Sequence, residues 1–184
     1  MSNLTDFFPS GGGGGLKPKF QEFTASGTFT PTQSLIDAGG YIELFLVGGG
    51  ETGNSNGSVG GTGGEVILKK MYLTSTTAIP VIIGAGGSGG TSVDGGASEF
   101  QASLSGGVDV TALGGANGGF VYDRQSSWGA ETDNSAGSGF AMYGMGGADA
   151  GWRGGITRPK PNSGCGSQGT NTAGSGYCLI KWYE

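Results

Sequence analysis

Few side chains in this sequence of 184 residues could carry out catalytic chemistry. It contains no histidine, which excludes the Ser-His-Asp and Cys-His arrangements of nucleophilic catalysis. Two cysteines and scattered carboxylates make an improbable zinc site, and no DxDxDG-type calcium loop is present. Paired carboxylates for glycoside hydrolysis could meet in space, although nothing in the sequence points to them. We therefore expect a protein that is not an enzyme and that uses no cofactor or metal.

Residues 84–89, Gly-Ala-Gly-Gly-Ser-Gly, match the GxGxxG pattern of dinucleotide-binding proteins and follow an apolar run. Dinucleotide binding requires a helix to begin at this point, so that its N-terminus can hold the pyrophosphate. The residues that follow, GTSVDGGAS, are poor helix formers. We interpret the match as a consequence of the glycine content and expect no nucleotide site.

The two cysteines, Cys165 and Cys178, are separated by twelve residues. Cys178 lies in the last apolar run and is typical of a small buried hydrophobic residue, whereas Cys165 lies in a glycine turn. A disulfide between them is geometrically possible. Two cysteines without a secretion signal favour thiols instead.

Aromatic residues embedded in glycine and serine are typical of residues 120–153. The candidate receptor-contact residues are Tyr122, Trp128, Phe140, Tyr143 and Trp152. Rigid rings in small, polar loops resemble a binding surface, because they offer contact area at low entropic cost. A structural interpretation, in which these rings cover the sandwich or fill a subunit interface, remains open beside it.

The first nine residues form a small apolar cluster of Leu4, Phe7, Phe8 and Pro9. A glycine-rich tether at residues 10–19, with five consecutive glycines, separates this cluster from the rest of the chain. Because the cluster has no core of its own to join, we expect a docking peptide for a partner protein. The alternative is a frayed terminus.

Short apolar runs separated by turns predict an all-β domain at residues 20–184. No window of twelve or more residues has helical periodicity with caps, so we expect almost no helix. The pattern favours an antiparallel β-sandwich with long glycine-rich loops. We expect a bend at Ser26-Gly27 in the first strand, and Pro80 at the start of a strand or in an edge strand. The expected strands are residues 20–30, 41–47, 65–73, 78–83, 97–104, 108–112 and 177–183.

Glycine accounts for 44 of the residues, a content close to that of low-complexity chains. Order is still favoured, because aromatic and branched residues, which disordered chains lack, gather into strand-like runs. The glycine loops at residues 48–64, 84–96 and 114–119 bring no apolar area to offset the entropy of ordering them. Either they are mobile, or they form extended helices with three residues per turn that bond one another's amides.

The net charge of −5 and the absence of a basic patch argue against nucleic acid as a partner. No stretch approaches the length of about 20 apolar residues that a transmembrane helix requires. We expect neither nucleic-acid binding nor membrane insertion.

An ordered set of motifs resembles the glycine-rich domain of bacteriophage tail fibre and tail-tip proteins. The set runs FTASGTFTP, YIELFLVGGG, GGTGGEVILKKMYL, IPVIIGAGGSGGTS, SEF and GSGYCLIKWYE. The resemblance covers residues 20–115 and 174–184, and residues 116–173 only by composition. The leader MSNLTDFFPSGGGGG also resembles the peptides by which some phage fibres attach to the virion.

The resemblance implies a structural protein of the virion, in a tail fibre or tail tip, that is attached through its N-terminal peptide and contacts a host receptor. It also implies a homotrimer and assembly in the host cytoplasm. The alternative is a purely architectural collar, baseplate or capsid-decorating protein that contacts no receptor.

Overall fold

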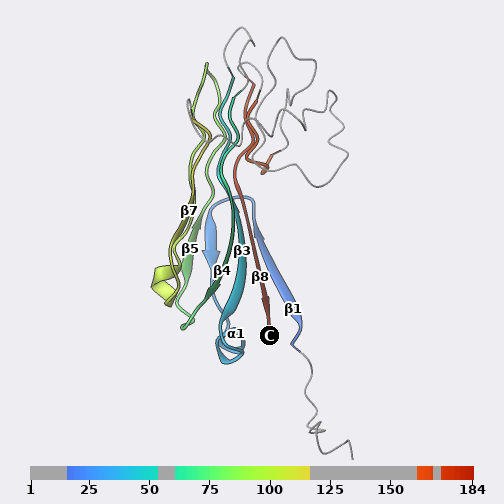
Figure 1. Cartoon of the computed structure of the whole chain (residues 1–184), viewed down its shortest axis with the longest axis vertical. Coiled ribbons are helices and arrows are strands. Elements are labelled where there is room, and N and C mark those ends of the chain that lie inside the picture. The colour runs from blue at the N-terminus through green and yellow to red at the C-terminus, as the bar shows by residue number, and fades with distance from the viewer. Residues whose placement is uncertain (1–15, 54–60, 117–160, 168–170) are drawn as a thin grey trace, which may run out of the picture.

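The computed structural model describes residues 16–53, 61–116, 161–167 and 171–184. Two four-stranded sheets pack against each other in it, and every strand pair is antiparallel (Figure 1). The first sheet has the order β1 (Pro18–Phe23), β8 (Tyr177–Tyr183), β3 (Tyr41–Val47) and β4 (Val66–Tyr72). The second has the order β2 (Gly27–Phe29), β5 (Ile79–Ile82), β6 (Ser98–Phe100) and β7 (Val110–Ala112). The predicted all-β antiparallel sandwich is confirmed.

The core lies between the two sheets and follows from alternation along the strands. In β3, Ile42, Leu44 and Leu46 are each at most 1% exposed, whereas the residues between them face the other way. Phe29 of the second sheet meets the edge of Trp182 from the first, with ring centroids 5.4 Å apart. Full burial of each such side chain stabilises the fold by about 1.5–3 kcal/mol.

The expected first strand is split between the sheets. β1 and β2 belong to different sheets, and the chain crosses from one to the other close to the predicted bend. The hydroxyl of Ser26 accepts the amide of Ile83 at 3.0 Å, which ties the crossing to the end of β5. β1 also begins at Pro18, inside the range expected for the tether, so the sandwich starts before Phe20.

Two short helices correct the expected connections and one expected strand. The helix α1 (Gln33–Asp37) begins after Thr32, whose hydroxyl accepts the amide of Leu35 at 3.0 Å. The strand expected at residues 97–104 ends at Phe100, and a 3-10 helix, η2 (Ala102–Ser105), follows it. There the carboxylate of Asp109 accepts the amide and the hydroxyl of Ser103, which holds the turn.

Pro80 is the second residue of β5, so its expected place near the start of a strand is confirmed. The expected alternative, an edge position, is wrong, because β5 lies between β2 and β6. Although proline has no amide to donate, its carbonyl oxygen accepts the amide of Gln101 at 3.1 Å.

Candidate functional site

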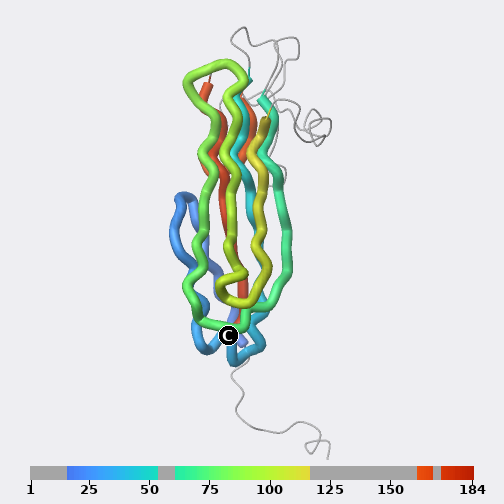
Figure 2. The backbone as a smooth tube through the Cα atoms, turned by 90° about the vertical axis from the view of Figure 1, so that its left-hand side faces the viewer, coloured from blue at the N-terminus to red at the C-terminus, as the bar shows by residue number. Residues whose placement is uncertain are grey.

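Beyond the two sheets, the described chain continues into seven extended, glycine-rich segments, which we call the glycine bundle (Figure 2). They are residues 48–53, 61–65, 84–87, 93–96, 113–116, 164–167 and 173–176. Four of them directly extend a strand of the sandwich, and residues 84–87 and 93–96 each lie one residue away from a strand, so the two parts are continuous (Figure 1). The bundle is the part of the fold from which the long loops depart.

Residues 48–53 form the centre of the glycine bundle, because they bond to all six other segments. The three central amides, of Gly49, Gly50 and Glu51, donate to Gly96, Gly174 and Thr62 at 2.8–2.9 Å. The three central carbonyls of the same residues accept the amides of Gly115, Gly87 and Ser167 at 2.8–3.0 Å. An extended chain without internal hydrogen bonds is thereby satisfied entirely by its neighbours.

The six outer segments also bond to one another and close a ring around the centre. Six backbone bonds of 2.8–2.9 Å connect them, written here as amide donor to carbonyl acceptor: Gly61 to Ser167, Gly174 to Cys165, Gly176 to Gly84, Gly96 to Ala85, Gly95 to Gly115, and Glu65 to Leu113. Each of these six bonds joins a different pair of adjacent outer segments. The bundle is therefore cross-linked on every side by backbone hydrogen bonds.

The bonds of the central segment repeat every three residues. Gly49 and Thr52 both donate to segment 93–96, and Gly48 and Glu51 both donate to segment 61–65. Three residues per turn is the period of the polyproline II conformation. Of the two sequence-based alternatives, the packed extended glycine helices are confirmed for these segments.

Glycine is required at the centre because the backbones approach too closely for a side chain. A Cβ added to Gly49 would lie 2.1 Å from the carbonyl oxygen of Ala85. One added to Gly50 would lie 2.2 Å from the carbonyl oxygen of Cys165. In both places a Cα hydrogen faces the oxygen instead, a geometry that adds weak Cα–H···O attraction.

Polar side chains fasten the segments at the end of the bundle that lies away from the sheets. Glu51 is only 3% exposed, and its carboxylate accepts the amide and the hydroxyl of Thr62 at 3.1 and 2.8 Å. The hydroxyl of Thr52 accepts the amide of Val93 at 2.7 Å and donates to the carbonyl of Gly90 at 2.9 Å. These bonds hold together the points at which the chain leaves and re-enters the bundle. The sequence did not predict these side-chain contacts. The one feature that could have indicated them is the Glu51-Thr52 pair, which directly follows three glycines.

The chain leaves the bundle at this far end after Gly53, Ala116 and Ser167. It re-enters there at Gly61, whereas residues 161–164 re-enter beside β3, where the backbone of Gly164 packs on the side chain of Val47. Of the described residues that flank segment 117–160, Ala116 therefore lies at the far end of the bundle, and residues 161–164 lead to Val47 at the junction with the first sheet.

The sequence-predicted site residues lie outside the described residues. This holds for the docking residues Leu4, Phe7, Phe8 and Pro9, and for the receptor-contact candidates Tyr122, Trp128, Phe140, Tyr143 and Trp152. What the structure does give is the position of the described residues that flank them. β1 and the C-terminus lie at the end opposite to the glycine bundle (Figure 1).

The GxGxxG match at residues 84–89 is part of the bundle. The amide of Gly84 donates to the hydroxyl of Ser98 at 2.9 Å, and that of Gly87 donates to Gly50 at 2.9 Å. Both amides are thus engaged within the fold.

Both cysteines are buried and carry thiols, so the prediction of thiols is confirmed. Burial raises the pKa of the Cys178 thiol to about 12, so it stays protonated near neutral pH. Cys165 lies inside the glycine bundle, where its sulfur is 3.7 Å from the carbonyl oxygen of Ser163.

The described residues contain no cluster of three or more His, Cys, Asp or Glu side chains placed to hold a metal ion. None of the helices among them has the length and apolar character needed to cross a membrane.

An antiparallel sandwich that extends into a bundle of packed glycine segments defines a class of glycine-rich β-domains. The family model described as "Glycine-rich domain" matches residues 24–181, and the chain belongs to this family. No curated protein and no solved structure matches the chain.

Proposed function

We propose that the protein is a structural component of a bacteriophage virion, placed in a tail fibre or tail tip, that contacts the host. Membership of the glycine-rich domain family agrees with this proposal, and the phage assignment itself rests on the resemblance of the ordered motifs. Neither catalysis nor a cofactor is part of the proposed role. The protein would be assembled onto the particle in the host cytoplasm.

The observation that carries the proposal is the separation of the two ends of the fold (Figure 1). The described chain begins at Leu16 beside the C-terminus, where Lys17 and Glu184 exchange backbone hydrogen bonds of 2.8 and 3.1 Å. The segment 117–160 departs at the other end, after Ala116. A leader that attaches at one end and aromatic loops that depart from the other suit a protein that links a particle to a cell.

Between these ends lies a continuous scaffold. β-Strands run directly into the cross-linked glycine bundle, so no hinge in the described residues separates the sandwich from the points of loop departure. Because loops that carry binding residues work best on a rigid support, this scaffold suits an adhesive role.

Attachment is tested with a deletion of residues 1–15. The sandwich begins after these residues, so the deleted protein should fold and melt as the full chain does. Particles produced with it should lack the protein, as detected by immunogold labelling, and Phe7→Ala/Phe8→Ala should act in nearly the same way, because each buried phenylalanine contributes about 1.5–3 kcal/mol. If the deleted protein is incorporated at the normal copy number, the leader is not the attachment site.

Adhesion is tested by adding the purified full chain to host cells before the phage. We expect adsorption to fall as the protein occupies the receptor. Normal adsorption at saturating protein, together with immunogold labelling of the particle, would instead support the architectural alternative of a collar, baseplate or decorating protein.

A further inference from the structure

The outer face of the first sheet is unusually apolar for a surface among the described residues. Phe20, Leu68 and Tyr72 on this face are 72%, 79% and 64% exposed. The outward positions of β5 to β7 include Ile82, which is 38% exposed, together with the partly buried Pro80 and Glu99 and the exposed Thr111. Large apolar side chains that are exposed on one sheet face are typical of a contact with another molecule.

Strand register arranges this face in three rows across the sheet. The first row lies at the end of the sheet away from the glycine bundle and contains Pro18 opposite Tyr183 and Tyr41 opposite Tyr72. The third row runs Glu22, Leu179, Phe45 and Leu68. The middle row runs Phe20, Lys181, Glu43 and Lys70. In the next row Val47 is buried, with the backbone of Gly164 against it, whereas Val66 at the edge is 41% exposed. The open surface is thus two mostly apolar rows, of which the third also contains Glu22, with a charged row between them that contains Phe20.

We propose that this face pairs with the same face of a second copy of the chain, about a two-fold axis parallel to the strands. Such an axis, placed between β8 and β3, sets each β8 against the partner's β3 and each β1 against the partner's β4. Residues of one row then meet the same row of the second copy in reverse order. The pairing goes beyond the proposed function and does not depend on it.

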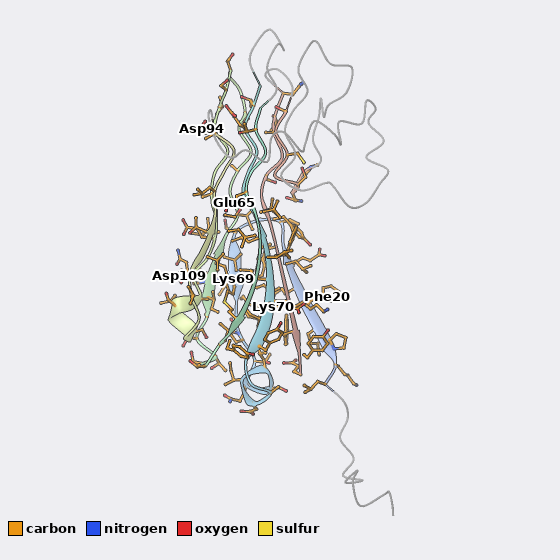
Figure 3. All side chains as sticks on the ribbon, in the orientation of Figure 1. Phe20, Glu65, Lys69, Lys70, Asp94 and Asp109 are labelled. Carbon is orange, nitrogen blue, oxygen red and sulfur yellow. The ribbon has the colours of Figure 1, made fainter. Side chains whose placement is uncertain are left out.

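The charged row selects this axis. Within one chain Glu43 lies 3.6 Å from Lys70 and 3.9 Å from Lys181, so one carboxylate serves two lysines. The proposed axis sets Lys181 of each copy against Glu43 of the other, and sets Phe20 against Lys70, a cation–π pair. Phe20 and Lys70 lie on the two edge strands of the sheet (Figure 3).

Other symmetric arrangements place like charges together. A two-fold axis across the strands would set Glu43 against Glu43 and Lys181 against Lys181. The family resemblance implies a homotrimer, in which three such faces would surround a common axis. The same strand of each copy would then lie nearest the axis, and its charged side chain would meet two identical charges. Like charges opposed across an interface are unfavourable. The chemistry of this face therefore favours two copies over three.

The apolar rows gain from the same axis. It sets Tyr183 against Tyr41 and Leu179 against Phe45, so rings and branched chains meet across the interface. The open face measures roughly 19 by 17 Å from strand spacing and rise per residue. Counted on both copies, this footprint is roughly 650 Å², below the standard size of a specific interface, so we expect a weak and transient dimer.

Analytical ultracentrifugation of the full chain from about 1 to about 200 µM tests the pairing. We expect the monomer at the low end and the dimer at the high end. Glu43→Lys should place lysine against lysine, and Lys181→Glu should place glutamate against glutamate, so each variant alone should dimerise at least about tenfold more weakly. An equimolar mixture of the two should restore the dimer, because each copy then offers the charge that the other lacks.

Matched controls change the same charges elsewhere. Lys69→Glu alters the neighbouring exposed lysine, which lies on the opposite face of β4 (Figure 3), and Glu99→Lys alters the outer face of the second sheet. Both should dimerise as the unchanged chain does. Circular dichroism melting confirms that every variant is folded.

Three results would overturn the proposal: a monomer at every concentration, a trimeric mass, or a dimer that is unaffected by the two variants and their mixture. If the chain is monomeric and becomes a dimer only when residues 1–15 or 117–160 are deleted, the face is covered by that segment of its own chain, and the proposal is equally wrong.

Discussion

The backbone amide of Gly50 donates to the carbonyl of Gly174 at 2.9 Å, across two segments that are 124 positions apart in the sequence. Neither segment contributes a large apolar side chain to this contact. The glycine bundle is therefore held by backbone hydrogen bonds and close backbone packing, whereas the sandwich is held by a conventional apolar core.

Glycine at position 50 should be essential for stability. In Gly50→Ala the added methyl group would meet the backbone of Cys165 and Gly166, which are fixed by their own bonds, so we expect a loss of about 3 kcal/mol or more in the free energy of unfolding. Gly90→Ala is the matched control, because there the methyl group meets only a side-chain methyl of Val93. Urea unfolding should show a change below about 1 kcal/mol for the control. Equal effects of the two substitutions would contradict the packing of the bundle.

The two thiols should be hidden in the folded protein and available in the unfolded one. Cys165 and Cys178 are both buried, and burial raises the pKa of Cys178 to about 12, so little thiolate exists at pH 8. We expect a thiol reagent to label neither cysteine of the native protein and both after denaturation without a reductant, as counted by mass spectrometry. Absence of labelling after denaturation would reveal a disulfide instead.

Glu184 should make a small contribution to stability that disappears in acid. The hydroxyl of Thr32, which donates to its carboxylate, is the main cause that lowers the pKa of Glu184 below 4.5. Since the folded pKa lies below the unfolded one, the contribution is present above pH 4.5 and is lost as the pH falls through the lowered value. Glu184→Gln should cost less than about 1 kcal/mol at pH 7. Its stability should equal that of the unchanged chain near pH 2, and a difference that persists there would rule out this linkage.

The strand pattern predicted the sandwich well because alternation and apolar runs report directly on a sheet with one buried face. It failed where polar contacts decide the outcome. The alternation of Phe100, Ala102 and Leu104 predicts a strand. Instead, the amide and hydroxyl of Ser103 donate to the carboxylate of Asp109, and residues 102–105 form a 3-10 helix. Leu104 is 54% exposed as a result.

The glycine bundle could be foreseen only as one of two alternatives. Nothing local shows that Gly50 lies beside Gly174, because such contacts depend on how seven segments pack together. The outer sheet face was missed for a different reason. The nearly continuous apolar run Tyr41–Val47 is typical of a mostly buried strand, whereas Tyr41 and Phe45 belong to a face that is only partly covered.

The aromatic residues of segment 117–160 should act in adhesion if the proposed function is right. Alanine at Trp128, Tyr143 or Trp152 should reduce phage adsorption while the melting temperature and assembly stay unchanged, because removal of a central interface aromatic typically costs ~2 kcal/mol or more of binding. Adsorption assays and melting curves of the same variants provide the check. Lowered melting temperatures or failed assembly would show that the rings are structural.

The central claim is that the glycine segments form an ordered bundle which supports the loops. Hydrogen exchange measured by NMR at individual amides tests it most directly. We predict that the amides of Gly49, Gly50, Gly87, Gly96, Gly115 and Gly174 exchange as slowly as those of β3, because opening any of them requires the bundle to come apart. Exchange of these amides within about tenfold of the rate of an unstructured chain, while β3 stays protected, would contradict the account.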